Sequence, residues 1–124
     1  MEARLRGSSD FQRVYRSGKR YEGTFLTAFV LPNSLTHHRF GVTASRKALG
    51  KAVDRNRAKR LLRETFRVTT PRLEGLQKRY DWVLNARRAL LLAESQKRLK
   101  EFERIIASVA REEGDISTVE SQRV

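Results

Sequence analysis

The segment from Arg55 to Arg67, RNRAKRLLRETFR, decides how the rest of the chain can fold and act. Six of its thirteen residues are Arg or Lys, and Glu64 is its one acidic residue. Such a segment is either a well-solvated helix face or a surface that holds a polyanion. Its periodicity and the sequence around it distinguish the two.

The spacing of apolar residues predicts an α-helix from about Val53 to Val68. Small and apolar side chains recur at intervals of three and four residues, as on the buried face of an amphipathic helix: Ala58, Leu61, Leu62, Thr65 and Phe66. The opposite side carries a polar and cationic band about 100° wide, made of Asn56, Lys59, Arg60, Arg63 and Arg67. Arg55 falls at the angle of the apolar positions, so we expect it in the first turn, directed outward.

Cations are concentrated in and around this helix. Residues 39–67 contain ten Lys or Arg against Asp54 and Glu64, a net charge of +8. Like charges three or four residues apart destabilise a helix by a few tenths of a kcal/mol each, so helix stability does not explain them. A merely soluble face would mix Glu with Lys, whereas the planar fork of Arg pairs with phosphate oxygens. We therefore predict a helix that binds nucleic acid.

The whole chain is short and strongly basic. Its 124 residues are enough for one domain, and 27 Lys or Arg against 14 Asp or Glu give a net charge of +13. Nucleic acid is the favoured partner, with an acidic membrane surface as the competing one. No apolar run approaches the roughly 18 residues of a membrane span, and the first residues lack the apolar core of a secretory signal. We expect a soluble, cytoplasmic protein.

The sequence contains no recognisable active site. It has no Cys, which excludes disulfides, thiolate nucleophiles and zinc fingers. His37 and His38 are adjacent in a polar stretch without an orienting acid nearby, so we interpret them as exposed turn residues. The motifs of serine hydrolases, zinc proteases and nucleotide-binding loops do not occur. We predict no catalytic residue, metal, cofactor or small-molecule substrate held by the protein itself.

The remaining segments predict a small sheet with helices packed on it. A first helix, DFQRVYRSG, has one stripe of Phe11, Val14 and Tyr15. Three strands are indicated by TFLTAFVL, RFGVTAS and YDWVLNA, and a last helix by the pattern from about Glu94 to Glu112. A short polar segment joins the first two strands, which suggests antiparallel pairing. The order α-β-β-α-β-α predicts an α/β fold of the α+β two-layer sandwich type, with a small central sheet.

Aromatic side chains suggest which nucleic acid is bound. Phe25, Thr27, Phe29 and Leu31 share one face of the first strand. Together with Phe11 and Tyr15 they could stack on unpaired bases, which favours single-stranded or structured RNA over duplex DNA. The alternative is that these aromatics belong to the core, which is the commoner use of such spacing.

Three segments together resemble one known family. FGVTASRKALGKAVDRNRAKRLLRETFR resembles the signature of the bacterial ribonuclease P protein component, whose basic helix begins with Arg-Asn-Arg. RLRGSSDFQRVYRSGKR resembles the first helix of that family, and YDWVLNAR resembles its last strand. The resemblance covers about residues 4–110. It implies a compact sandwich with a left-handed β-α-β crossover, an exception to the usual right-handed rule.

The resemblance also implies a division of labour. In this family an RNA subunit carries out the Mg²⁺-dependent hydrolysis that removes the 5′ leader of precursor tRNA, and the protein assists. The surface against the catalytic RNA would comprise Ser45, Arg46, Lys47, Arg55, Asn56, Arg57, Lys59, Arg60, Arg63 and Arg67. The cleft for the single-stranded leader would be lined by Phe11, Tyr15, Thr27 and Phe29. We expect a protein monomer within a one-to-one ribonucleoprotein.

Two features depart from the family pattern. Asn85 stands where the family generally has an apolar residue, which bears on the packing of the last strand. The C-terminal segment is acidic, so we expect one domain over residues 1–112 and a disordered tail over 113–124. The alternative function is that of a small ribosomal protein with a structural role, which would share the size, basicity and RNA-binding helix.

Overall fold

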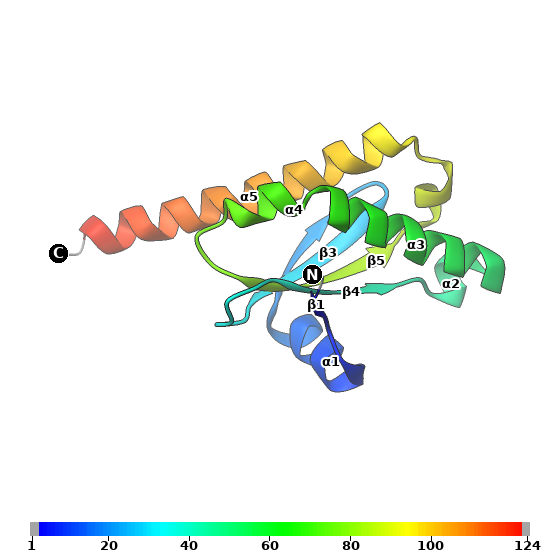
Figure 1. The fold of residues 1–124 in the computed structure, drawn as a ribbon, viewed down its shortest axis with the longest axis horizontal. Coiled ribbons are helices and arrows are strands. Elements are labelled where there is room, and N and C mark those ends of the chain that lie inside the picture. Colours follow the sequence, from blue (N-terminus) through cyan, green and yellow to red (C-terminus); the bar gives the residue numbers. More distant parts are fainter. Residues whose placement is uncertain (1–2, 123–124) are drawn as a thin grey trace.

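The computed structural model describes the backbone of residues 3–122 and the side chains of residues 4–114 (Figure 1). Five strands are present: β1 (Ala3–Arg4), β2 (Lys19–Glu22), β3 (Leu26–Pro32), β4 (Arg39–Thr43) and β5 (Tyr80–Ala86). The helices are α1 (Gly7–Ser17), α2 (Arg46–Leu49), α3 (Ala52–Val68), α4 (Thr70–Glu74), the 3₁₀ turn η1 (Arg88–Leu92) and α5 (Ser95–Gln122). Within the described residues, no helix is both long and apolar enough to cross a membrane.

The strands form one sheet in the order β1-β4-β5-β3-β2. β5 lies at its centre, antiparallel to β3 and parallel to β4. The predicted antiparallel pairing of the second strand with the first is therefore wrong, because β5 lies between β3 and β4. Burial agrees with this order: six of the seven residues of β5 are buried, as expected for the central strand, which is covered on both faces and at both edges.

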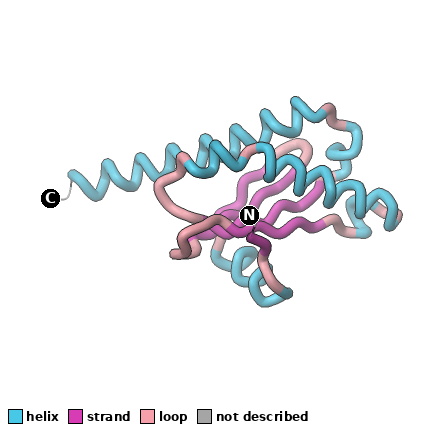
Figure 2. Tube along the Cα trace, in the orientation of Figure 1, coloured by secondary structure: helices cyan, strands magenta, loops and turns pink. Residues whose placement is uncertain are grey.

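The parallel pair β4 and β5 is joined by a β-α-β crossover. The connection contains α2, α3 and α4, and it runs over the same face of the sheet as α5 (Figures 1 and 2). α1 lies alone on the opposite face. The α+β class predicted from the sequence is confirmed.

The larger core lies between the sheet and the helices α3 and α5. Its centre is aromatic: the rings of Phe40 and Phe66 stack at 4.4 Å, and Trp82 meets Phe102 edge-to-face at 5.5 Å. The predicted inner face of α3 is buried at Ala58, Leu62, Thr65 and Phe66. α3 ends where the Thr69 hydroxyl donates to carbonyls of the last turn.

A smaller core lies between the sheet and α1. Val14 is fully buried against Leu5 and Val83, and Phe11 and Phe29 pack around them. The ring of Phe11 lies directly over Gly41 of β4, where a Cβ atom would meet the ring at 2.3 Å. A side chain at position 41 would therefore lift α1 from the sheet.

The sequence missed the shorter elements. β1 and β2 contain two and four residues, and β2 has the polar edge-strand sequence KRYE, which carries no apolar alternation. α2, α4 and η1 are single turns of four or five residues, too short for a helical period to be recognised.

The end of the last helix also differs from the prediction. α5 continues through Gly114 to Gln122, beyond the end near Glu112 that the sequence predicted. Glu113 belongs to the domain: it is buried, and its carboxylate accepts hydrogen bonds from the backbone N–H groups of Gln77 and Lys78. Gly inside a helix costs about 1 kcal/mol relative to Ala, which is too little to end a helix anchored in this way.

Candidate RNA-binding surfaces

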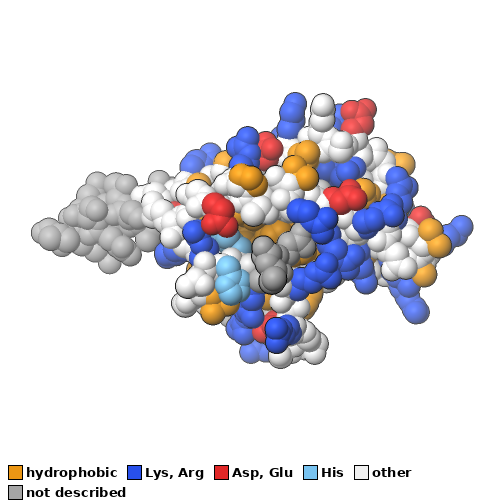
Figure 3. All heavy atoms as spheres, viewed as in Figure 1, with side chains coloured by type: hydrophobic (Ala, Val, Ile, Leu, Met, Phe, Trp, Pro, Cys, Tyr) orange, Lys and Arg blue, Asp and Glu red, His pale blue; other side chains and the backbone are white. Residues whose placement is uncertain are grey.

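The outer side of α3 presents the cations that the sequence placed there. Asn56, Arg57, Arg60 and Arg67 are exposed, and Lys59 and Arg63 are partly exposed. Lys and Arg side chains gather in Figure 3 over the part of the molecule where Figure 1 places α2 and α3. Arg55 differs from the prediction: its guanidinium donates to the carbonyl of Gly50, so it secures the turn before α3 instead of pointing outward.

The Ser45–Lys47 turn extends this basic surface. The Ser45 side chain caps α2 by accepting the N–H of Ala48 at 3.1 Å, which fixes the start of the helix. Arg46 and Lys47 follow in the same turn and are exposed. We call α3 together with Ser45–Lys47 the basic helix surface.

A second candidate surface lies on the α1 side of the sheet, at the end of the strands where Thr27, Thr43 and Asn85 are register partners. There the sheet is hollowed by a cavity of about 670 Å³, within the range of about 300–1,000 Å³ typical of ligand sites. We call it the open hollow; it is lined by Arg20, Glu22, Thr27, Thr43, Ser45, Lys47, Ala48, Asn85, Ala86, Arg87 and Arg88.

Aromatic side chains border the open hollow. The ring of Tyr15 meets Phe29 edge-to-face at 4.9 Å, and the Arg20 guanidinium lies 5.9 Å from the centre of the Phe29 ring. Tyr15 remains 39% exposed, so its ring is accessible to a ligand. Of the four residues expected to line a leader cleft, Tyr15, Thr27 and Phe29 lie together here.

Phe11, the fourth of these residues, lies elsewhere. It faces Gly41 and lines a separate hollow of about 150 Å³ at the edge of β4, together with Arg4 and Arg63. Helical spacing put Phe11 and Tyr15 on one stripe of α1, but the stripe crosses several strands. The two rings therefore meet different parts of the sheet.

Asn85 is a member of the open hollow that the sequence interpretation did not assign to it. Its Oδ1 atom accepts hydrogen bonds from the hydroxyls of Tyr15, at 2.9 Å, and Thr43, at 2.6 Å. Alternation along β5 could have placed it: Asp81, Val83 and Asn85 share one face of the strand, and Val83 packs under α1. The polar residue therefore does not disturb the larger core, which lies on the other face.

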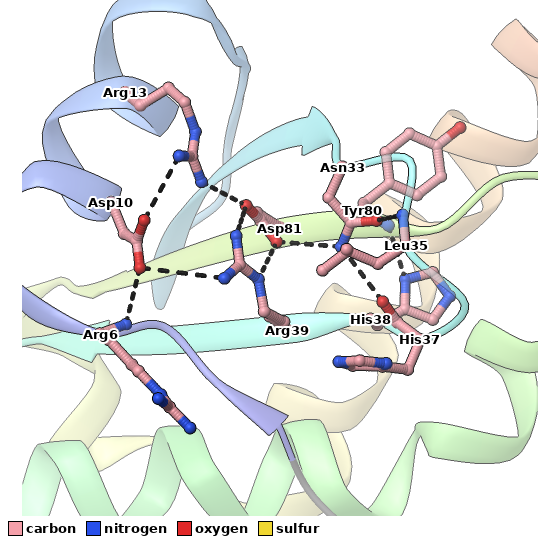
Figure 4. Close-up of polar contacts among 10 residues, drawn as sticks. All are labelled: Arg6, Asp10, Arg13, Asn33, Leu35, His37, His38, Arg39, Tyr80 and Asp81. Atoms are coloured by element: carbon pink, nitrogen blue, oxygen red, sulfur yellow. Dashed lines mark hydrogen bonds and ion pairs between the residues drawn. The ribbon is translucent and has the colours of Figure 1, made fainter.

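The opposite end of the same face is closed by ion pairs (Figure 4). Asp81 is 1% exposed; Arg39 binds its carboxylate through two nitrogens at 2.9 and 2.7 Å. Arg13 of α1 and Asn33 also donate to it, at 2.9 and 3.0 Å. Burial alone would raise the pKa of Asp81, but these hydrogen bonds outweigh burial and hold the pKa below its usual value. We call Asp81 with Arg13, Asn33 and Arg39 the Asp81 network.

His38 lies near this network and is not the exposed turn residue that the sequence predicted. It is buried; its Nδ1 atom accepts the Tyr80 N–H at 3.0 Å and the Trp82 indole N–H at 3.2 Å. Its Nε2 atom donates to the carbonyl of Leu73 at 3.1 Å, so the ring is neutral. Burial is the main cause that lowers the pKa of His38. His37 is exposed, as predicted.

The two candidate surfaces lie on different sides of the sheet. α3 covers one face and α1 the other (Figure 1). The lining of the open hollow places it on the α1 face. Ser45 and Lys47 belong to both, since they continue the basic helix surface and line the rim of the open hollow. The two candidate surfaces therefore lie on opposite faces of the sheet and meet at Ser45 and Lys47.

Comparisons with known proteins agree on one family. The family model described as ribonuclease P matches residues 1–110. The ribonuclease P protein component of Clostridium botulinum (strain Langeland) is 40% identical over 86 residues, which are 69% of this chain and 75% of that one. The component of Methylococcus capsulatus is 43% identical over 84 residues, which are 68% of this chain and 62% of that one.

Solved structures give the same result. The Staphylococcus aureus ribonuclease P protein superposes with a TM-score of 0.72 at 28% identity, covering 89% of this chain and 99% of that one. The Thermotoga maritima ribonuclease P protein superposes with a TM-score of 0.72 at 25% identity, covering 85% of this chain and 96% of that one. These matches give no support to the ribosomal alternative. The chain belongs to the bacterial ribonuclease P protein family, and it is the protein subunit of a ribonucleoprotein endoribonuclease that processes precursor tRNA.

Proposed function

We propose that the basic helix surface lies against the catalytic RNA while the open hollow holds the single-stranded 5′ leader of precursor tRNA. The observation that carries this assignment is the separation of the two surfaces by the sheet, which allows one protein to touch both RNAs. The basic helix surface offers Arg and Lys side chains for a phosphate backbone. The open hollow adds Tyr15 and Phe29, on which unpaired bases can stack.

The chemistry belongs to the RNA subunit in this proposal. Mg²⁺ bound by that RNA promotes hydrolysis of the phosphodiester, and one protein per RNA positions the substrate. The protein supplies cations that offset phosphate repulsion between the two RNAs, so it replaces part of the screening that a high Mg²⁺ concentration provides. Residues 55–63 would do this at the catalytic RNA, and the open hollow at the leader.

Reconstitution tests the proposal. A bacterial ribonuclease P RNA at low Mg²⁺ should cleave precursor tRNA slowly, and the added protein should restore cleavage at the mature 5′ end. The protein without RNA should not cleave at any Mg²⁺ concentration. Specific cleavage by the RNA-free protein, or no stimulation of the RNA, would contradict the assignment.

A second measurement isolates the leader. The holoenzyme should bind precursor tRNA with a leader of several nucleotides more tightly than mature tRNA, and this difference should be smaller for the RNA subunit alone. If precursor and mature tRNA differ in affinity by the same amount with and without the protein, the leader does not bind in the open hollow.

A further inference from the structure

The floor of the open hollow carries one amide whose two polar atoms are used differently. The Oδ1 atom of Asn85 accepts from two hydroxyl groups, those of Tyr15 and Thr43. A carbonyl oxygen has two lone pairs, so this oxygen is saturated. Within the described residues the Nδ2 atom makes no hydrogen bond, and the residue is only partly buried. Asn85 therefore faces the hollow as a donor.

The two hydroxyls also hold the amide in this orientation. Tyr15 reaches it from α1, and Thr43 from β4, where its Cα is the register partner of Asn85. Both hydroxyl groups donate to the same atom, Oδ1 of Asn85. The ring of Tyr15 is itself held by its edge-to-face contact with Phe29, which keeps its hydroxyl beside the amide.

Most other polar groups of the hollow are already engaged or are suited to phosphate, and the Thr27 hydroxyl, which can both donate and accept, is the exception among the lining residues. Glu22 forms an ion pair with Arg20, and the Ser45 hydroxyl caps α2. Lys47, Arg87 and Arg88 are exposed cations on the rim, suited to a phosphate backbone, which carries no sequence information. Asn85 is thus the neutral group in this hollow that offers donors alone to a base.

Where the amide meets the exocyclic group of a base, a donor without a free acceptor distinguishes two classes of base. Asn normally pairs with adenine by donating to N7 and accepting from the N6 amino group, and here the second bond has no acceptor. An amino group of adenine or cytosine would meet the amide N–H groups donor to donor. The carbonyl O4 of uracil or O6 of guanine can accept from them. We propose that Asn85 makes the open hollow select a keto-bearing base, uracil or guanine, at one position of the leader. This inference rests on the proposed function, which places the leader in this hollow.

The test uses the reconstituted holoenzyme and precursor tRNAs that differ by uridine or cytidine at one leader position, scanned along the leader. One position should bind about three- to tenfold more tightly with uridine, as expected for one hydrogen bond. Asn85→Val, which replaces the amide by a side chain suited to a strand, should remove the preference at that position.

Tyr15→Phe is the matched variant, because it keeps the ring and its contact with Phe29 and removes one donor to Oδ1. The freed lone pair can accept from cytosine, so the uridine-to-cytidine ratio should fall. An unchanged ratio in Tyr15→Phe would contradict the saturated oxygen, and a wild-type preference for cytidine or adenosine would overturn the proposal.

Failure of this inference can be separated from failure of the proposed function. If the leader strengthens binding but uridine and cytidine are equal at every position, or if their difference survives Asn85→Val, the hollow holds the leader without reading this base. If precursor and mature tRNA bind equally, the leader does not lie there and both proposals fail.

Discussion

Asp81 and Asn85 lie on the same face of β5, four residues apart. They differ in how many of their polar atoms are hydrogen-bonded within the protein. Asp81 is bound by Arg13, Arg39 and Asn33 and is almost inaccessible. Asn85 has its oxygen bound and its nitrogen directed to an open hollow. At the Asp81 end of the α1 face, the polar side chain is fully bound by other protein groups. At the Asn85 end, the amide nitrogen remains available to a ligand.

The difference indicates why α1 is placed as it is. Arg13 links α1 to Asp81 at the closed end, and Val14 fills the centre of the small core. With the helix fixed at these points, the ring of Tyr15 stands over the beginning of the open hollow. The hydrogen-bonded Asp81 network therefore holds α1 in place, and α1 in turn holds Tyr15 beside the open hollow.

Breaking the closed end should have the largest effect. Asp81→Asn removes the charge that holds Arg13 and Arg39, and we expect a loss of about 2 to 3 kcal/mol in the free energy of unfolding, measured by urea denaturation. The loss is below that of a fully buried pair because Arg13 is 48% exposed and can return to water.

The matched control is Glu74→Gln. Glu74 pairs with Arg79 at 3.4 Å but is 63% exposed, and we expect a change within about 0.5 kcal/mol. Equal losses for the two variants would mean that the Asp81 network does not secure the fold.

Altering the open end should affect binding and not folding. Tyr15→Leu removes an accessible ring, so binding of precursor tRNA to the holoenzyme should weaken by about 1 to 3 kcal/mol, with mature tRNA unchanged. Phe11→Leu should affect the leader much less, because Phe11 packs over Gly41 in the separate hollow. Competition binding of the two substrates measures both. If Phe11→Leu weakens precursor tRNA binding more than Tyr15→Leu does, the leader lies nearer to the edge of β4 than proposed.

A substitution on the opposite face should leave the leader contribution intact. Arg60 is exposed on α3, and Arg60→Ala should weaken binding of the RNA subunit and reduce the slope of log affinity against log salt by about 0.7 to 0.9, one phosphate contact. The ratio of precursor to mature tRNA affinity should not change. An unchanged salt slope would remove Arg60 from the interface with the RNA subunit.

The sequence predicted those parts of the molecule that depend on local periodicity. The buried side of α3 and the alternation of β3 follow directly from the spacing of apolar residues. The pairing of β5 between β3 and β4 did not follow, because strand order depends on contacts between residues far apart in the chain. The anchoring of Glu113 by backbone groups near Lys78 was missed for the same reason.

The two polar residues of β5 illustrate the limit for the site. Asp81 and Asn85 were visible as polar residues in an apolar strand, but their partners come from α1, β3 and β4. A single sequence does not say which of the two will be saturated. The separation of Phe11 from Tyr15 had the same cause, since helical spacing does not specify which strand each ring meets.

The smallest expected effect concerns His38, at the closed end and on the other face of the sheet. Its folded-state pKa lies below the usual value of about 6.5, first because burial disfavours the imidazolium, and Arg79 acts in the same direction. Hydrogen bonding to Leu73 and the charge of Glu74 oppose the shift without cancelling it. The unfolded chain therefore takes up this proton first as pH falls. Stability from neutral His38 should be complete above about pH 6.5 and decline below it, through the folded-state pKa.

The window for His38 is distinct from that of Asp81. The folded-state pKa of Asp81 is lowered, so its contribution is lost only below the usual carboxyl range of about 4. Urea denaturation between pH 7 and 5 should thus report on His38, and His38→Gln should flatten the curve there even though it lowers stability at neutral pH. His37→Gln is the control, since His37 is the adjacent histidine and its side chain is exposed. A curve equally steep in His38→Gln and the wild type would assign the acid sensitivity to other groups and leave the buried imidazole with a packing role alone.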